Sequence, residues 1–243
     1  MLAQRSRSRR CFREVFRETY NLNSMVKDGI WYGLGLGVVA AVIFYTTGDV
    51  KLIWPPLLLA AFFLWFFRDP NRKIPTGPGE IVSPADGVVT EAEWVETTQG
   101  SKLRVSIFLN VFDVHVNRSP IAGTVSLVEY REGGFMNAMK PESGLTNEQT
   151  MIQIQGDGYD VSLKQIAGLL ARRIVCNLKV GDRVERGQRI GLIKFGSRVD
   201  VLIPAAANLK VKTGSRVKGG STVLAVLPEV PAEAELAATA VVA

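Results

Sequence analysis

The chain has 243 residues and carries 29 Lys+Arg against 23 Asp+Glu, which gives a formal net charge of +6. That length suits one large domain or two small ones. Its two cysteines, Cys11 and Cys176, exclude a disulfide framework and a cysteine metal cluster, and they favour a reducing compartment.

The N-terminal segment, residues 1–28, is basic and leads into apolar sequence. It holds seven basic and three acidic residues. A basic end beside an apolar segment favours binding to anionic lipid headgroups. Nucleic acid is the competing partner, but no aromatic-rich basic groove and no zinc-ligand spacing supports it, so we expect none.

Two uncharged apolar stretches follow, "GIWYGLGLGVVAAVIFYTT" at residues 29–47 and "LIWPPLLLAAFFLWFF" at residues 52–67. The first is just long enough to span a bilayer as a helix, and the second is short. Both outer flanks of the pair are basic, which favours a membrane hairpin over residues 29–67 with both flanks on the cytoplasmic side. We therefore expect a cell-membrane protein whose remaining chain faces the cytoplasm. The hairpin either spans the bilayer or re-enters it; a hairpin buried in a soluble protein is the alternative.

The rest of the chain changes character. Residues 68–80, "RDPNRKIPTGPGE", are rich in Pro and Gly and indicate a linker. From residue 81 to residue 227, runs rich in Val, Ile and Phe alternate with polar residues, which is typical of β-strands. Within them, residues 131–150 are polar and predict a loop. Residues 228–243 are rich in Ala and Glu and predict a disordered tail.

An internal repeat lies within the β region. Residues 178–193, "LKVGDRVERGQRIGLI", align with residues 211–226, "VKTGSRVKGGSTVLAV", at an offset of 33 (211 − 178). Glycines supply the turns, and the Val and Ile positions face a common core. Similar hairpin units build the flattened barrel of biotinyl and lipoyl carrier domains, but their acceptor lysine is missing here. We expect a mainly β fold, a barrel-sandwich-like β domain with an internal hairpin repeat, preceded by an N-terminal α-helical membrane hairpin.

The stretch "KFGSRVDVLIP", residues 194–204, lies between the two repeat units and has strand periodicity interrupted by Gly196 and Ser197. A bulge or bend in a strand is one explanation. The other is chemical, because a serine hydroxyl can attack the preceding carbonyl, and glycine leaves that carbonyl unobstructed. The resulting ester can eliminate, which releases a chain ending at Gly196, and hydrolysis then turns Ser197 into a pyruvoyl group. Such a ketone can form a Schiff base with an amine and act as an electron sink.

Self-cleavage of this kind needs a base, and His115 is the only histidine in the chain. Asp86, in the turn "SPADG", could orient His115 as a third member of the site. A plain Asp-Gly turn is the alternative explanation for Asp86. An electron-sink mechanism needs no metal, and we expect none.

Four motifs follow the apolar segments in a fixed order: "FFRDPNRKIP", "SPADGVV", "FLNVFDVHVNRSP" and "FGSRVDVLIP". Together they resemble the small class of phosphatidylserine decarboxylase proenzymes, and the match covers roughly residues 52–227. The resemblance implies a self-cleaving, membrane-associated enzyme. Such an enzyme converts phosphatidylserine to phosphatidylethanolamine and CO2, with a covalent pyruvoyl group as its cofactor.

The motifs also imply roles for individual residues. Ser197 would become the pyruvoyl group after cleavage between Gly196 and Ser197. Asp86 and His115 would match the acid and the imidazole that assist cleavage, and His115 would also serve in decarboxylation. The large chain, which ends at residue 196, and the small chain, which starts at residue 197, would form a heterodimer, with further dimerisation left open.

Two positions depart from the better-known larger class of that family. Arg198 follows Ser197 where the larger class has threonine. Arg118 stands where it has a second histidine, so the division of roles between His115 and Arg118 is open. The candidate partners for the lipid phosphate or carboxylate are Arg68, Arg72, Arg118 and Arg198.

Two other functions are considered. The same chemistry could act on another serine-headgroup lipid, such as archaetidylserine. The chain could instead be a non-enzymatic, membrane-anchored β module that binds lipids with its basic end, and that alternative predicts one intact chain.

Overall fold

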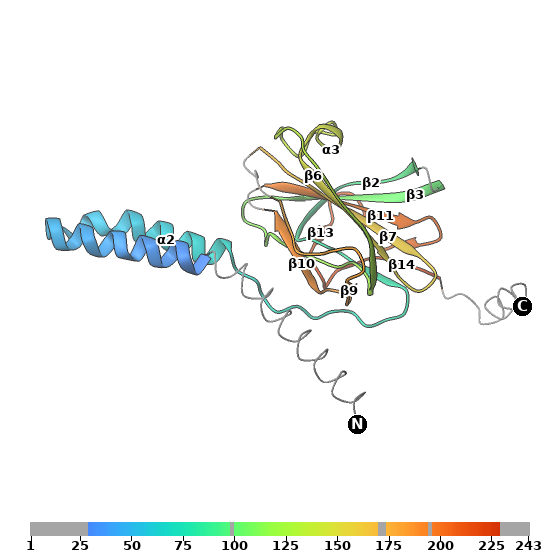
Figure 1. Cartoon of the computed structure of the whole chain (residues 1–243), viewed down its shortest axis with the longest axis horizontal. Coiled ribbons are helices and arrows are strands. Elements are labelled where there is room, and N and C mark those ends of the chain that lie inside the picture. The colour runs from blue at the N-terminus through green and yellow to red at the C-terminus, as the bar shows by residue number, and fades with distance from the viewer. Residues whose placement is uncertain (1–28, 98–99, 170–173, 194–195, 229–243) are drawn as a thin grey trace, which may run out of the picture.

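The structure, a computed structural model, describes residues 29–97, 100–169, 174–193 and 196–228 (Figure 1). An apolar helical hairpin leads into a β domain. The predicted basic segment, residues 1–28, lies outside the described residues, as do residues 229–243 of the predicted tail.

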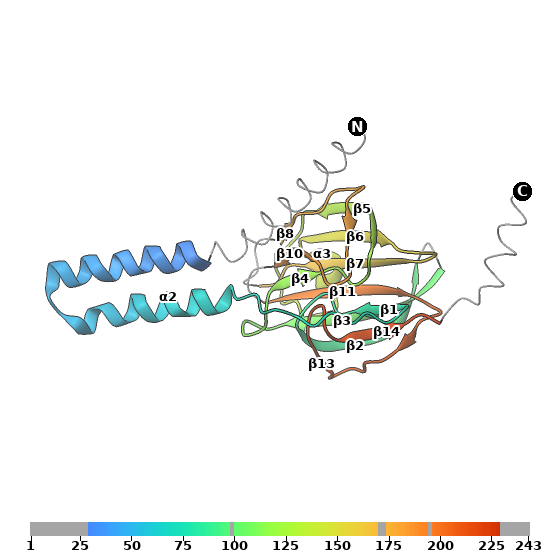
Figure 2. The ribbon, with the colours of Figure 1, turned by 90° about the horizontal axis from the view of Figure 1, so that it is seen from below.

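The hairpin consists of an apolar helix, Gly29–Thr47, a short 3-10 turn, η1 (Val50–Ile53), and helix α2 (Trp54–Phe66). The Asp49 side chain accepts from the Lys51 N–H at the start of η1. Prolines occupy the first turn of α2, where their missing N–H groups leave nothing unsatisfied. The two helices lie side by side and project away from the β domain (Figures 1 and 2).

Close contact between the two helices depends on glycine. A Cβ added at Gly29 would lie 2.8 Å from the Cβ of Phe67, and one added at Gly33 would lie 3.2 Å from the Leu64 side chain. Small residues at such positions are typical of helix pairs in membranes. Most other side chains of the helix Gly29–Thr47 are exposed. Within the described part of the chain, it is the one helix long and apolar enough to cross a membrane.

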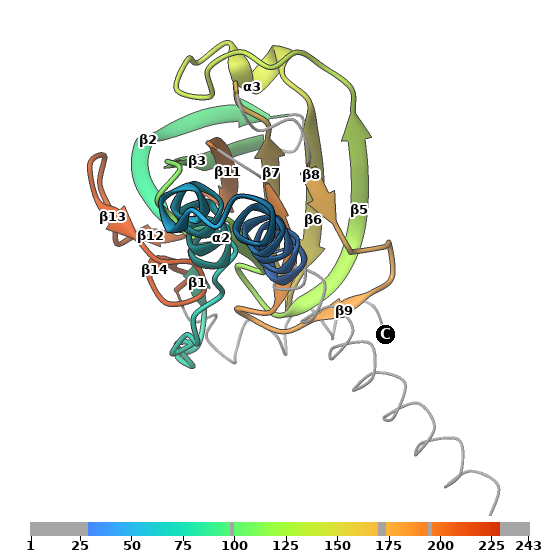
Figure 3. The ribbon, with the colours of Figure 1, turned by 90° about the vertical axis from the view of Figure 1, so that its left-hand side faces the viewer.

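The β domain is built on an eight-stranded antiparallel sheet that curls around the core (Figure 3). Its strand order is β13 (Arg216–Val217), β2 (Gly87–Thr97), β3 (Gly100–Leu109), β11 (Ser197–Pro204), β7 (Asp160–Ile166), β6 (Gln149–Gln155), β5 (Gly123–Arg131) and β9 (Arg183–Val184). Two three-stranded sheets complete the domain: β1 (Glu80–Val82), β14 (Val223–Val226) and β12 (Asn208–Leu209), and β4 (Val116–Arg118), β10 (Arg189–Ile193) and β8 (Ile174–Cys176). The predicted mainly β fold behind a helical hairpin is confirmed.

Strand β11 lies inside the large sheet, between β3 and β7. Its alternate residues Val199, Val201 and Ile203 are fully buried in the main apolar core, as the period of two predicts. The residues between them face the outer side of the sheet. There the predicted loop, which includes the short helix α3 (Ser143–Thr146), covers part of the sheet. A Cβ added at Gly144 would lie 3.8 Å from the Asp200 carboxylate.

The predicted repeat is present in the backbone. Strands β9 and β10 of the first unit correspond to β13 and β14 of the second. Glycines at matching positions share a positive φ, 90° at Gly181 and 88° at Gly214, and 76° at both Gly187 and Gly220. Each unit closes one edge of the large sheet, because β9 pairs with β5 and β13 pairs with β2. The repeat is therefore architectural.

The repeat also extends further than the sequence pattern predicted. Residues 83–87, "SPADG", lead into β2, and residues 119–123, "SPIAG", lead into β5. In each copy the serine hydroxyl donates to the carbonyl two residues later, at 2.7 Å for Ser83 and 2.6 Å for Ser119. In each copy the serine carbonyl accepts from the turn glycine of the neighbouring repeat unit, at 2.7 and 2.8 Å. Asp86 stands in the first copy where the second has Ala122.

Candidate active site

The Gly196–Ser197 peptide bond lies at the start of β11. Gly196 has a φ of 61°, a left-handed conformation that favours glycine over other residues. Ser197 is fully buried and pairs with Leu109 on β3. Its Oγ has no hydrogen-bond partner among the described residues. A buried hydroxyl without a partner is unusual, and it leaves this oxygen free to react.

His115 contacts the same peptide bond. Its Nδ1 lies 2.8 Å from the carbonyl oxygen of Asp113, which can only accept, so Nδ1 carries the proton. Nε2 is then the acceptor, and it receives the N–H of Gly196 at 3.3 Å. Burial lowers the pKa of His115 to about 4, although the Asp113 carbonyl and carboxylate act in the opposite direction. At neutral pH the ring is therefore an uncharged base with its lone pair directed at the backbone beside Ser197.

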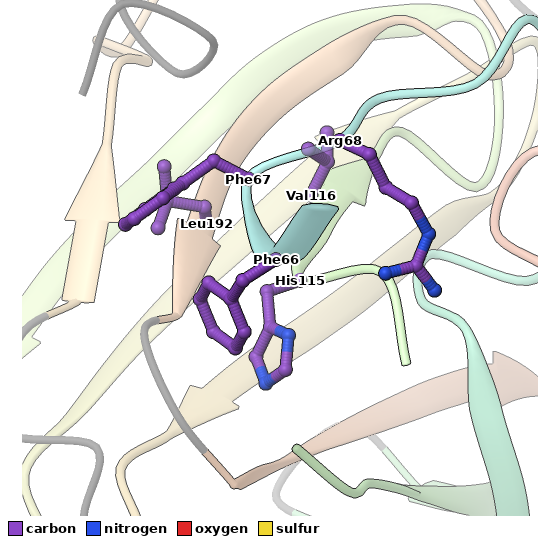
Figure 4. Close-up of a pocket in the computed structure, with 6 residues that line it drawn as sticks. All are labelled: Phe66, Phe67, Arg68, His115, Val116 and Leu192. Atoms are coloured by element: carbon purple, nitrogen blue, oxygen red, sulfur yellow. The ribbon is translucent and has the colours of Figure 1, made fainter. Parts of the chain in front are cut away.

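The end of the apolar hairpin forms one wall of this site. The Phe66 ring lies against the His115 ring, with 4.6 Å between centroids (Figure 4). A cavity of about 10 Å³ lies there, lined by Phe66, Phe67, Arg68, His115, Val116 and Leu192. The last turn of α2 thus buries the histidine, and the site lies where the hairpin joins the β domain.

The predicted linker forms no helix or strand, but ion pairs and hydrogen bonds bind it to the surface of the β domain. We call residues 68–79 the strap. Arg68 donates to the Phe112 carbonyl at 2.8 Å. Asp69 is almost fully buried and accepts from Arg118 at 2.7 Å, with Arg189 as a second partner. The strap therefore holds the hairpin in a fixed position relative to His115.

Asp86 pairs with the strap. Its carboxylate accepts from Arg72 at 2.8 and 3.0 Å and from the Gly219 N–H at 2.8 Å. Both ring nitrogens of His115 contact backbone groups, so the predicted orientation of His115 by Asp86 is not part of this arrangement. The physical reason is that the turn of Asp86 faces the second repeat unit and the strap.

The arginine candidates occupy different environments. Arg118 is bound by Asp69 and donates to the Gly187 carbonyl at 3.0 Å. Arg72 is bound by Asp86. Arg68 lines the cavity beside His115 and lies 4.0 Å from the centre of the Trp65 ring. Arg68 is thus the candidate that shares a cavity with His115.

Arg198 does not meet Ser197. Its guanidinium donates to Asp200 at 2.5 and 3.1 Å, to Glu91 at 3.1 Å and to Ser106 at 2.9 Å. Adjacent strand residues point to opposite faces, so this buried cluster lies on the outer side of the sheet. No group of three or more metal-ligating side chains occurs in the part of the chain that the structure describes.

Comparison with known proteins decides the family. A sequence model of the phosphatidylserine decarboxylase family matches residues 59–225, more than half of the chain. A protein of Solibacter usitatus (strain Ellin6076), named phosphatidylserine decarboxylase proenzyme, is 50% identical over 201 residues, 83% of this chain and 96% of that protein. Proteins of the same name from Burkholderia pseudomallei (strain 1106a) and Burkholderia cenocepacia (strain HI2424) are 43% and 41% identical. Their matches cover 83% and 82% of this chain and 94% of each relative.

The chain belongs to the phosphatidylserine decarboxylase family. The predicted resemblance is confirmed, and so is the prediction of an enzyme rather than a binding module. The family match also includes the last turns of α2 from Leu59, the strap and the strands of the β domain up to Ala225.

Three further residues of this decarboxylase-family site were missed from the sequence. A Cβ added at Gly168 would lie 2.0 Å from the carbonyl oxygen of Gly196, so the Gly196–Ser197 peptide bond packs directly on Gly168. Gln165 donates to Asn117 at 2.8 Å, and both are fully buried. Asn117 lies two residues after His115, the spacing that shares a strand face, and this signal could have found it. No sequence signal could have identified Gly168 or Gln165, because the residues they contact are remote in sequence.

Proposed function

We propose that the chain is a self-cleaving, pyruvoyl-dependent decarboxylase that converts phosphatidylserine to phosphatidylethanolamine and CO2 at a membrane surface. Family membership and the names of the relatives support the substrate. One observation carries the mechanism: the acceptor nitrogen of a neutral His115 receives the Gly196 N–H at 3.3 Å, beside the buried and unpartnered Ser197 hydroxyl.

Cleavage would begin when His115 Nε2 takes the proton of the Ser197 hydroxyl. The Oγ attacks the Gly196 carbonyl carbon and the peptide C–N bond breaks, so an ester replaces the amide and the nitrogen becomes a free amine. Loss of the Ser197 α-proton breaks the Cβ–Oγ bond and releases the Gly196 carboxylate. The remaining dehydroalanine takes up one water and releases ammonia, which leaves a pyruvoyl ketone at position 197.

The residues around position 197 fit this group. Ser197 is fully buried at the first residue of an interior strand, so a rigid scaffold would hold the ketone. The pyruvoyl ketone supplies an electron acceptor beside the substrate amine. His115 is placed to hold the proton that returns to the substrate α-carbon after CO2 has left.

The hairpin supports a membrane location. Away from the turn between its two helices, most of its exposed side chains are apolar, and Trp31, Trp54 and Trp65 lie near helix ends, as interface anchors do. We propose that the hairpin is embedded in the cell membrane with the β domain on the cytoplasmic side. Arg68 then lies at the base of the hairpin beside His115, and we propose it as a partner for the lipid phosphate.

The test is the intact mass of the detergent-extracted protein, with and without hydroxylamine. We expect two chains that separate at Gly196/Ser197, and we expect hydroxylamine to shift only the smaller one. The Ser197→Ala variant should stay intact and inactive, whereas Ser126→Ala, at an exposed serine on β5, should behave like the wild type. A wild-type chain that stays intact in the presence of lipid would contradict the proposal, and so would an active Ser197→Ala variant.

The lipid is tested by CO2 release from vesicles. Phosphatidylserine should be decarboxylated faster than a serine-headgroup lipid with an ether-linked isoprenoid core. The reverse preference would favour the archaetidylserine alternative.

A further inference from the structure

Two buried amides near the reactive bond keep unpaired polar atoms. Gln165 Nε2 donates to Asn117 Oδ1 at 2.8 Å, and both side chains are fully buried. Asn117 Nδ2 and Gln165 Oε1 have no hydrogen-bond partner among the described residues. If both amides are turned over, the pair still makes one bond and still leaves one NH2 group and one carbonyl oxygen. Because a buried polar atom without a partner destabilises the folded state, these two atoms require an explanation.

Strand register places the amide pair beside Ser197 and His115. Gln165 on β7 pairs with Val199 on β11, so Gln165 and Ser197 are diagonal neighbours on the same face of the sheet. Diagonal neighbours lie roughly 7–8 Å apart. Asn117 lies in β4, two residues beyond His115, which directly precedes that strand. The amide pair therefore connects the strand that follows His115 with the strand that neighbours Ser197.

Two guanidinium groups that neighbour these residues in sequence are already neutralised, and Arg68, beside His115, is the proposed partner of the lipid phosphate. Arg118, the residue after Asn117, is bound by Asp69. Arg198 is bound by Asp200 on the outer face of the sheet. On the inner face, among the described residues, the unpaired polar side-chain atoms near Ser197 belong to the neutral amides.

We propose that Asn117 and Gln165 bind the serine headgroup of the substrate. The Asn117 amide donates to the α-carboxylate, and the Gln165 carbonyl accepts from the amine. This assignment rests on the proposed function. A neutral donor suits a carboxylate whose charge disappears as CO2 forms. A guanidinium would stabilise the charged ground state more than the transition state and would slow the loss of CO2.

The first test separates the two reactions of the site. Asn117→Asp keeps the acceptor for Gln165 Nε2 but removes the donor, and Gln165→Met removes the acceptor at similar volume. In both variants self-cleavage should proceed at the wild-type rate, because the precursor cleaves without substrate. The kcat/KM for phosphatidylserine should fall about 10- to 100-fold, as expected for one lost hydrogen bond to a charged group. Gln149→Met is the matched control, since Gln149 is a buried glutamine on the outer face of the same sheet.

The second test measures Schiff-base formation with each headgroup, and the adduct mass shows whether the trapped lipid has kept its carboxylate. Phosphatidylcholine vesicles carrying either phosphatidylserine or phosphatidylethanolamine are treated with cyanoborohydride, and the mass of the small chain reports the trapped lipid amine. Asn117→Asp should lower trapping of the serine headgroup and leave trapping of the ethanolamine headgroup unchanged, because only the former has a carboxylate.

Three results would overturn the inference while leaving the proposed function intact. The first is unchanged kcat/KM in both variants. The second is an equal loss of trapping for both headgroups. The third is slowed cleavage together with a lowered melting temperature in both variants, which would assign the pair a structural hydrogen bond. Failure of the proposed function has a different signature, because the wild type itself would then neither cleave nor trap lipid.

Discussion

The Gly196–Ser197 bond is held by a separate contact on each side. The Gly196 N–H donates to His115 Nε2 at 3.3 Å, and the Gly196 carbonyl oxygen lies against the backbone of Gly168. The left-handed φ of Gly196 permits this orientation. An attack on the carbonyl carbon requires the carbonyl to be presented at a fixed angle, so we propose Gly168 as a positioning residue for self-cleavage.

Replacement of Gly168 by alanine should therefore slow cleavage. The added methyl would lie 2.0 Å from the Gly196 oxygen, and either the carbonyl or the segment after β7 must move. We expect the cleavage rate to fall by at least about tenfold, since a displacement of 1 Å can cost 100-fold. The assay is a time course of chain scission in precursor made by cell-free translation. Gly134→Ala is the control, because its nearest neighbour would be 3.7 Å away, and equal rates for the two variants would contradict the role of Gly168.

The buried state of His115 predicts an unusual pH profile. Because burial lowers its pKa to about 4, His115 stays neutral and able to accept a proton far below pH 6.5. The cleavage rate should therefore stay nearly constant from about pH 8 to about pH 5 and fall through a midpoint near pH 4. Cleavage rates at fixed ionic strength test this, with circular dichroism to confirm that the precursor stays folded. A midpoint at pH 6.5 would mean that the base is solvated or is another group.

At the scale of elements, the hairpin and the β domain meet at His115. Helix α2 ends at Phe66, whose ring covers the imidazole, and the strap then binds the β domain through Arg68, Asp69 and Arg72. The hairpin that we propose to lie in the membrane therefore also buries the His115 imidazole. If the hairpin is embedded in lipid, its position and the pKa of His115 are coupled through the Phe66 ring.

Phe66→Ala should raise the pKa of His115. Loss of the ring admits water to the imidazole and reduces the desolvation that lowers the pKa. The midpoint of the cleavage profile should move from near pH 4 toward pH 6.5, and Phe66→Leu should give a smaller shift. Phe44→Ala makes the same change on the exposed surface of the other helix and should leave the midpoint in place. An unchanged midpoint in Phe66→Ala would show that other groups bury His115.

Local pattern predicted the elements well and predicted their partners poorly. The alternation of β11 and the glycines of the repeat follow from local geometry, so strands and turns could be read from the sequence. Ser197 and His115 could be identified because each lies in a distinctive motif. The partner of Asp86 is Arg72, in a segment without periodicity, and Gly168 meets Gly196 only after β7 and β11 have paired. Contacts of that kind depend on tertiary packing, which no local pattern encodes.

At the scale of the whole molecule, two related halves enclose one site. The turns that precede β2 and β5 make the same serine hydrogen bonds, and each repeat unit closes one edge of the sheet. The halves differ at Asp86, which has Ala122 as its counterpart. Only the Asp86 turn faces Arg72 of the strap, so this difference fixes the side on which the hairpin joins the β domain.

The same topology predicts that cleavage does not release the small chain. The small chain would contain β11 to β14. Of these strands, β11 lies between β3 and β7, β13 pairs with β2, and β14 pairs with β1. Val199, Val201 and Ile203 of β11 are fully buried in the main core, so separation would expose the core of both chains.

We therefore expect the cleaved chains to co-elute in size-exclusion chromatography in detergent and to separate only at urea concentrations that unfold the protein. Gel analysis of the fractions and circular dichroism across the same urea series measure the two events. The intact Ser197→Ala precursor is the reference. It should unfold at a similar or slightly higher urea concentration, because the intact peptide bond lowers the conformational entropy of the unfolded state by only one chain connection. A small chain that elutes alone in native buffer would contradict the interleaved strand order, since a strand between two others cannot leave while the sheet stays folded.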